Sequence, residues 1–458
     1  MDRPPRTTLQ DILTNSLILR QTTPHLPLRT LLALAATSKS LRLTLTNPNN
    51  KPDIYRYLDL STLPSPATAS IESTPIDVGG ISWRAERMDE SLTEDDFHSG
   101  PLRGIFSHLQ RQSILSNVQT LVLDGLSVPA DLVREVLTEE RYQVRILSMR
   151  GVRNLNEGRL QQVLRYVVRP TRAEGGLRLR GLYVFGSREP VGLRVGGQRQ
   201  QQQGWEDGGG LGVMAAEGAQ IGARWEGERL TGKTGSVDCG DEEGKWYHST
   251  GRVLKRLQSD WPDTLAACKG IIAFDAVLCR GPRHDIAKTT SKEFLQATIA
   301  TVALGPTGCE ICHSCPEGSA VFGKSSEDML PLLGPAPLQA STVRAAQYPN
   351  PQYHDENGSM PRLILRCDDC LRGRWCESCN RWWCEDCYEE PVSRLHQRTE
   401  LQQIETRTEL QRNGWMGGVE GGPAAGAGTA VKVYNHLCVE RCLVSEMMSG
   451  AGSAGMWG

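Results

Sequence analysis

The chain has 458 residues, 39% of them hydrophobic, and a net charge of −2 at pH 7. This length allows roughly two or three domains, and the balanced charge argues against nucleic acid as a partner. The N-terminus lacks the apolar segment of a signal peptide, and no apolar run approaches the length of about 18 residues that a membrane span needs. Fourteen cysteines without a secretory signal predict a cytoplasmic or nuclear protein, in which clustered thiols favour metal binding over disulfides.

Apolar residues at helical spacing predict three short helices near the N-terminus. The first helix precedes the breaks at Pro24 and Pro27, the second follows them, and the polar turn at residues 37–42 leads into the third. The apolar positions are Leu9, Ile12, Leu13 and Leu17 in the first helix, and Leu28, Leu31, Leu32 and Ala35 in the second.

The residues of this unit are more specific than their spacing. The segment LPLRTLLALAATSKSLR at residues 26–42, followed by IYRYLDLS at residues 54–61, resembles the F-box. The resemblance covers residues 7–60, although the opening phrase at residues 8–13 lacks the family's Pro. It implies a motif that binds the Skp-family adaptor of a cullin complex. The adaptor contacts would come from Leu26, Pro27, Leu28, Leu31 and Leu32, and those that do not face the adaptor would pack inside the motif.

A repeated phrase predicts a second domain at residues 111–308, after a linker at residues 61–110 that has room for one helix. The phrase is apolar-x-x-apolar-x-apolar-x-Gly, with amphipathic helices between copies and a shift of 26 residues between the first two. This pattern is typical of a leucine-rich repeat, in which parallel strands stack with helical crossovers. A generic α/β domain is the alternative. The copies begin at Val118, Val144, Leu179 and Phe274, with a weaker fifth at Ile299.

The strands of such a repeat domain would present a concave face to a target protein. Aromatic and arginine side chains are common at the centres of interfaces, so the predicted target contacts are Arg150, Tyr183, Phe185 and Arg280. Two inserts are expected around this framework: a disordered one at residues 187–255, rich in Gly and Gln, and a helical and Gly-rich one at residues 389–430.

The C-terminal part holds the strongest chemical signal. Three Cys-x-x-Cys pairs lie within residues 367–387, and each pair can offer two thiolates to a tetrahedral Zn²⁺. We predict a cysteine-rich zinc module at residues 309–388, to which the segment at residues 431–445 returns. The candidate ligands are Cys309, Cys312, Cys315, Cys367, Cys370, Cys376, Cys379, Cys384, Cys387, Cys438 and Cys442.

The cysteine count leaves two or three zinc ions open, with His313 or His436 as the twelfth ligand of a third site. Interleaving predicts that Cys367/Cys370 shares a site with Cys384/Cys387. The pair Cys376/Cys379 would then join Cys309/Cys312 or Cys438/Cys442. We interpret Cys279 as a small buried hydrophobic residue. Because the tryptophans at 375, 382 and 383 alternate with the ligands, they are expected to cover the metal.

These features together predict an α+β multi-domain protein with an F-box, an irregular leucine-rich-repeat-like solenoid, a zinc-stabilised module and disordered inserts. Two functions are compatible with this fold. This organisation predicts a non-catalytic substrate receptor of a Skp–cullin–F-box ubiquitin ligase. The alternative is a cullin-independent zinc-finger ligase or a zinc-binding scaffold. No motif for a conventional enzyme is present, and thiolate-filled sites would be structural.

Overall fold

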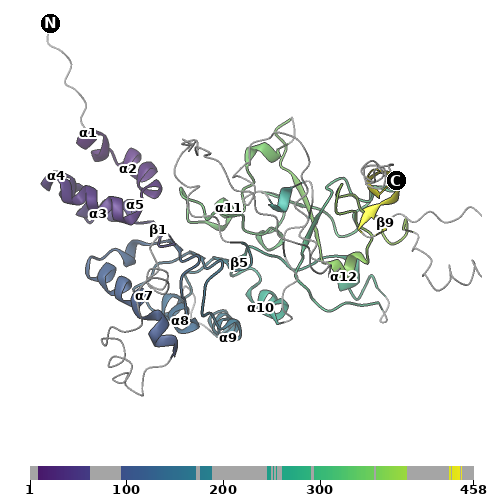
Figure 1. The fold of residues 1–458 in the computed structure, drawn as a ribbon, viewed down its shortest axis with the longest axis horizontal. Coiled ribbons are helices and arrows are strands. Elements are labelled where there is room, and N and C mark those ends of the chain that lie inside the picture. The colour runs from purple at the N-terminus through teal and green to yellow at the C-terminus, as the bar shows by residue number, and fades with distance from the viewer. Residues whose placement is uncertain are drawn as a thin grey trace, which may run out of the picture.

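A computed structural model describes residues 9–61, 94–171, 176–187, 245–248, 251, 254, 260–289, 293–354, 357–388, 433–434, 436–443 and 445. Residues 188–244 and 389–432, which make up most of the two predicted inserts, lie outside the described residues, as does most of the predicted linker, residues 62–93. The architecture is mixed α/β. N-terminal helices stand at one end, a parallel sheet follows, and a loop-rich part containing the cysteines forms the other end (Figure 1).

The N-terminal unit is built from short helices. The predicted first helix is divided at Asn15, whose side chain accepts hydrogen bonds from the backbone N–H groups of Leu17 (3.0 Å) and Ile18 (3.4 Å) and so begins a new helix. Ser38 caps a later helix in the same way. The elements are α1 (Leu9–Thr14), α2 (Ser16–Thr22), the 3₁₀ turn η1 (Thr23–His25), α3 (Leu28–Thr37), α4 (Lys39–Thr46) and α5 (Lys51–Ile54).

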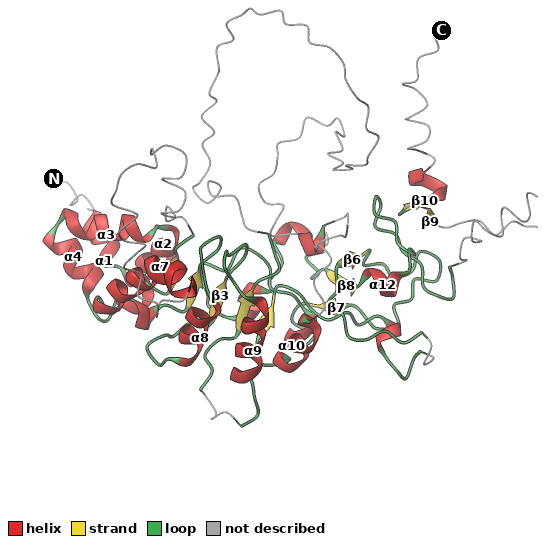
Figure 2. Cartoon of the chain, turned by 60° about the horizontal axis from the view of Figure 1, so that its bottom comes forward, coloured by secondary structure: helices red, strands yellow, loops and turns green. Residues whose placement is uncertain are grey.

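The predicted parallel sheet is confirmed. Its strands follow chain order: β1 (Tyr57–Asp59), β2 (Thr120–Val122), β3 (Ile146–Ser148), β4 (Gly181–Tyr183) and β5 (Ala273–Phe274). The register aligns one buried apolar residue from each strand, namely Leu58, Leu121, Leu147, Leu182 and Phe274. Helices lie along one side of this sheet (Figure 2). They are α7 (Glu94–Arg111), α8 (Ala130–Thr138), α9 (Glu157–Val167) and α10 (Trp261–Cys268), with the turn η2 (Leu115–Asn117).

The register corrects the predicted repeats at both ends. Phe274 pairs with Leu182, so the fourth copy is displaced by three residues along the chain. The fifth copy leaves the parallel sheet, because β6 (Val302–Leu304) pairs antiparallel with β8 (Arg362–Arg366), which also pairs with β7 (Ala320–Val321). At the other end, β1 is a strand that the spacing missed. Apolar spacing marks a strand but does not say which strand it pairs with.

The face of the sheet opposite the helices is covered by the chain itself. We call residues 330–347 the covering segment; it includes α11 (Val343–Ala346) and follows the turn η5 (Glu327–Met329). Its backbone N–H at Leu332 donates to Phe274 O (2.8 Å), and the Tyr183 hydroxyl donates to Leu333 O (2.8 Å). Its apolar side chains pack on those of the strands: Leu332, Ala336, Val343 and Ala346 against Tyr57, Val122, Ile146 and Tyr183.

The expected target-binding face is therefore not a free concave surface. Arg150 is 3% exposed and pairs with Asp124 (2.9 Å), and Tyr183 is fully buried. Phe185 packs edge-on against Trp261, while Arg280 donates to the Glu317 carbonyl (2.6 Å). The expectation of an exposed face was wrong because the covering segment, which lies within the predicted zinc module, carries enough apolar side chains to cover the sheet.

Parts of the predicted linker and insert belong to the core. Three residues of α7 (Leu102, Phe106 and Leu109) are buried, as are Trp246 and Leu254. The remaining short elements are η3 (Lys245–Tyr247), η4 (Pro282–His284), η6 (Pro351–Tyr353), α12 (Asp368–Leu371), β9 (Val433–Tyr434), β10 (Leu437–Cys438) and η7 (Val439–Leu443). Among the described residues, no helix is both long and apolar enough to cross a membrane.

Candidate metal centre

Three groups of side chains converge in the C-terminal part, and each is geometrically suited to hold a metal ion. Within each group the potential ligand atoms all lie within 4.8 Å of one another. Two groups contain four cysteines and the third contains two cysteines and one histidine. They are Cys309, Cys312, Cys384 and Cys387; Cys376, Cys379, Cys438 and Cys442; and Cys279, His284 and Cys367. All of these thiols are free of disulfides.

The first group, which we call site A, joins two turns that are 72 residues apart. Cys312 Sγ lies 3.6 Å from Cys384 Sγ. The backbone N–H of Cys384 donates to Cys309 Sγ at 3.3 Å. Cys309 and Cys384 are buried, whereas Cys312 is exposed and Cys387 is half-buried. Site A therefore opens to solvent on one side.

The second group, site B, repeats this arrangement with the C-terminal segment. Cys379 Sγ lies 3.6 Å from Cys438 Sγ, and the backbone N–H of Cys438 donates to Cys376 Sγ at 3.2 Å. The fourth member is Cys442, in η7. The segment carrying Cys438 is thus held against the module by this group, as the sequence predicted for residues 431–445.

These separations agree with a shared tetrahedral ion. Four sulfurs at about 2.3 Å from a Zn²⁺ ion lie about 3.8 Å from one another, whereas a disulfide needs about 2.05 Å. The observed 3.6 Å lies close to the first value. Backbone N–H groups that donate to sulfur favour the thiolate, which is the form that binds metal.

Left-handed residues close the Cys-x-x-Cys turns. His313 (φ 55°) follows Cys312, and Asn380 (φ 56°) follows Cys379. Gly308 (φ 94°) comes just before site A, and a side chain there would approach His313 O to 2.5 Å. The turn therefore requires glycine at this position.

The thiols of these groups share protons unevenly. The Ser314 hydroxyl and backbone lower the pKa of Cys312 to about 6, while a hydrogen bond with Cys384 raises the pKa of Cys387 to about 12. Cys312 ionises readily because its neighbours donate hydrogen bonds to its thiolate. Cys387 then resists ionisation, because a second negative charge close to the first is unfavourable. A divalent cation bound by all of the thiolates at once would remove this repulsion.

Tryptophans and an arginine pack around the two sites, as predicted for the tryptophans. Trp375, Trp382 and Trp383 are each at most 5% exposed. Trp382 donates to Gly305 O (3.1 Å) and lies under the Arg366 guanidinium, which is 4.4 Å from the ring centre. The three tryptophans form a second small core with most of the cysteines of sites A and B, separate from the core of the sheet.

The structure settles the open pairings. The pair Cys384/Cys387 groups with Cys309/Cys312, so the expected pairing with Cys367/Cys370 was wrong. The pair Cys376/Cys379 joins Cys438/Cys442, one of the two predicted alternatives. Among the described residues, Cys315, His313 and His436 belong to none of the three groups.

The third group contains two residues that sequence reasoning missed as ligands. Cys279 follows β5, and His284 ends η4, only five residues later. The spacing Cys-x-x-x-x-His was the available signal, but Cys279 also matched an apolar position of the misaligned fourth repeat. His284 Nδ1 faces the carbonyl of Gln296 (2.8 Å), so Nε2 is the ring nitrogen that faces Cys367 Sγ, at 3.2 Å.

Comparison with known proteins adds no relative. The chain matches no family model, no curated protein and no solved structure.

Proposed function

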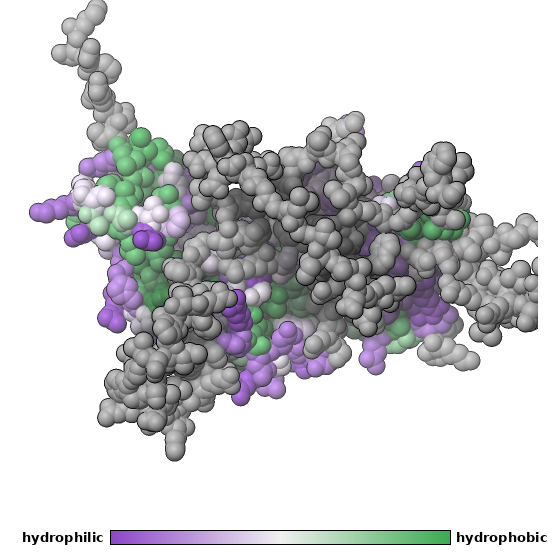
Figure 3. All heavy atoms as spheres, in the orientation of Figure 1, coloured by the Kyte–Doolittle hydropathy of each residue, from purple (hydrophilic) through white to green (hydrophobic). Residues whose placement is uncertain are grey.

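We propose that this protein is a non-catalytic substrate receptor of a Skp–cullin–F-box ubiquitin ligase, stabilised by structural zinc. The observation that carries this proposal is an uncovered apolar surface on the N-terminal helices (Figure 3). Of the eleven large apolar side chains that are exposed in the described residues, six lie on α1 to α4. They are Leu9, Ile12, Leu17, Ile18, Leu32 and Leu43. Exposed apolar patches of this kind favour a protein partner.

The burial of the predicted adaptor contacts refines which of them are available. Leu32 is 36% exposed and Pro27 is exposed, whereas Leu31 is 4% exposed and belongs to the core of the unit. Leu26 and Leu28 are half-buried and pack against that core. We therefore assign partner contact to Pro27 and Leu32, and an internal packing role to Leu31.

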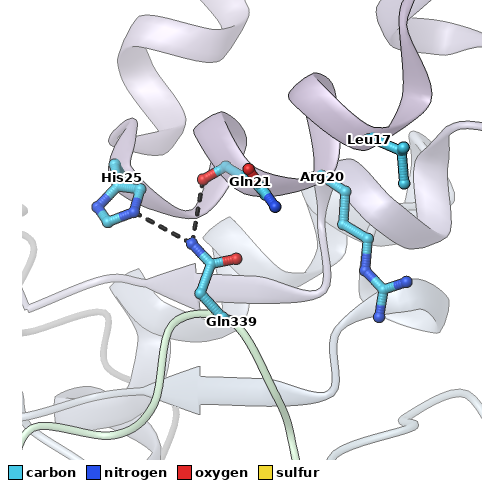
Figure 4. A pocket seen from close by; sticks show the side chains of 5 residues that line it. All are labelled: Leu17, Arg20, Gln21, His25 and Gln339. Carbon is cyan, nitrogen blue, oxygen red and sulfur yellow. Dashed lines mark hydrogen bonds between the residues drawn. The ribbon is translucent and has the colours of Figure 1, made fainter.

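A hollow beside this apolar surface lies between the N-terminal helices and the covering segment. Its volume is about 570 Å³, and it is lined by Leu17, Arg20, Gln21, His25 and Gln339. Gln339 Nε2 donates to Gln21 O (3.1 Å) and lies 3.2 Å from His25 Nε2 (Figure 4). These contacts tie the helices to the sheet domain, which favours a fixed geometry between adaptor and target.

Zinc is the metal that the donor set favours. Groups of four thiolates select zinc or iron–sulfur clusters, and thiolate groups with four protein ligands are typical of structural zinc. Four protein ligands leave no open position for water, which supports a structural role for sites A and B rather than a catalytic one.

Capture of a purified Skp-type adaptor by the full chain tests the adaptor proposal. We expect Leu17→Glu/Leu32→Glu to lose at least tenfold in capture, because it places charge on the apolar surface. Ile286→Glu is the matched control, since Ile286 is 76% exposed but lies far along the chain from these helices, and it should capture normally. Equal capture by the double variant and the wild type would refute the adaptor proposal. Ubiquitin transfer by the full chain with a conjugating enzyme and no adaptor would instead favour the zinc-finger ligase.

A further inference from the structure

The three groups share a pattern of contacts that goes beyond the residue types. In sites A and B, the first cysteine of the later pair donates its backbone N–H to the first ligand of the earlier pair. These bonds are Cys384 to Cys309 (3.3 Å) and Cys438 to Cys376 (3.2 Å). The third group has the same bond, from the Cys367 N–H to Cys279 Sγ (3.2 Å).

A second contact also recurs. In sites A and B, the second ligand of the earlier pair lies beside the first cysteine of the later pair, at 3.6 Å in both. In the third group, His284 Nε2 occupies the place of that second ligand, 3.2 Å from Cys367 Sγ. The earlier pair is thus Cys279 and His284, and the later pair begins at Cys367.

By this correspondence the third group lacks only a fourth ligand, the one that Cys387 supplies in site A and Cys442 supplies in site B. The next cysteine after Cys367 is Cys370, one α12 turn further on, whose backbone N–H donates to Cys367 Sγ (3.3 Å). Cys370 is fully buried, and a side chain at Gly281 would approach its sulfur to 2.2 Å. Gly281 N in turn donates to Cys279 Sγ (3.4 Å), so Cys370 and Cys279 face the same turn.

We infer that Cys279, His284, Cys367 and Cys370 form a third zinc site with three thiolates and one imidazole, which we call site C. Cys370 lies outside the tightest set of three ligand atoms but beside it. Site C rests on the zinc binding proposed above. The hydrogen bond from His284 Nδ1 to the Gln296 carbonyl orients the imidazole, as the hydrogen-bond partners of ligating histidines do in metal sites.

Site C differs from the other two in what it connects. Cys279 follows the last parallel strand, and Cys367 directly follows β8 inside the cysteine-rich module, 88 residues later. Cys279, Cys367 and Cys370 all belong to the main core of the sheet domain. An ion here cross-links the sheet domain to the module, whereas sites A and B hold the module together internally.

Elemental mass spectrometry, which measures the number of zinc ions per purified full chain, tests this inference. We expect three zinc ions per wild-type chain, one for each group, and two per Cys279→Ser/His284→Ala chain. Cys315→Ser is the control, because Cys315 lies in the same module but in none of the groups, and it should keep three. Two ions in the wild type and two in the double variant would overturn site C and leave the zinc proposal standing. No zinc in the wild type would overturn both.

A conservative variant separates ligation from a structural role of the histidine. His284→Cys supplies a fourth thiolate at the same position, so it should retain three ions. After replacement of zinc by Co²⁺, its sulfur-to-metal charge-transfer absorption should exceed that of the wild type, because one more thiolate is bound. Unchanged charge-transfer absorption at three ions would show that residue 284 is not a ligand.

Discussion

The contact between Leu332 and Gly181 offers a direct test that the covering segment lies on the sheet. Leu332 is 1% exposed, and a Cβ at Gly181 would lie 3.2 Å from its Cδ1 atom. Leu332→Ala should lower the free energy of unfolding by about 3 kcal/mol, since it removes buried methyl groups and leaves a cavity. Gly181→Ala alone should cost about 1 kcal/mol, because the added methyl is overpacked against Leu332.

The double variant Gly181→Ala/Leu332→Ala tests whether residues 181 and 332 are in contact. Its new alanine methyl at residue 181 enters space that Leu332→Ala vacates, so the two costs should not add. We expect the double variant to be more stable than the sum predicts by about 1 kcal/mol, measured by urea unfolding followed by circular dichroism with zinc present. Additivity within about 0.5 kcal/mol would refute the contact. Leu43→Ala is the control for an exposed leucine (71% exposed) and should change stability by less than about 0.5 kcal/mol.

Two further predictions concern buried charges. Glu317→Gln should cost about 3 kcal/mol in urea unfolding, because it strips the bidentate partner (2.6 and 2.8 Å) from Arg366, which is 1% exposed. Glu310→Gln, which breaks the more exposed pair with Arg381, should cost less than about 1 kcal/mol, and equal costs would contradict the reasoning. Burial raises the pKa of Asp275, although backbone N–H groups and Arg150 oppose the rise. The stability linked to this carboxyl is therefore present below its unfolded pKa of about 4 and is lost as pH rises through the folded value. Asp275→Asn should gain stability relative to the wild type between pH 4 and pH 7 in the same assay, and a constant difference would contradict the raised pKa.

The strands and helices of the sheet domain were predictable where the pattern was local and strong. The spacing around Leu121, Leu147 and Leu182 marked β2, β3 and β4, and the structure places these residues side by side. Prediction failed at the edges of the sheet. The strand β1 has only three residues, and the phrase around Val302 fits a strand of either direction, since apolar alternation carries no information about the partner.

The covering segment shows a different limit. Its apolar residues lie between prolines and glycines, which are typical of loops, and no periodicity identifies the surface that they bury. They are buried because the sheet presents an apolar face made by strands from distant parts of the chain. As a consequence, Arg150 and Tyr183 became internal residues rather than an exposed surface for a target.

The cysteines divide most clearly between sequence and tertiary structure. The sequence by itself determined the Cys-x-x-Cys pairs, because a tight turn brings two sulfurs together whatever the rest of the chain does. Only the tertiary structure decided which pairs share a group, since ligands separated by 59 to 88 residues meet only after strands and loops have packed. It also added Cys279 and His284 and set Cys315 aside. Position in the fold, rather than residue type, selects the ligands.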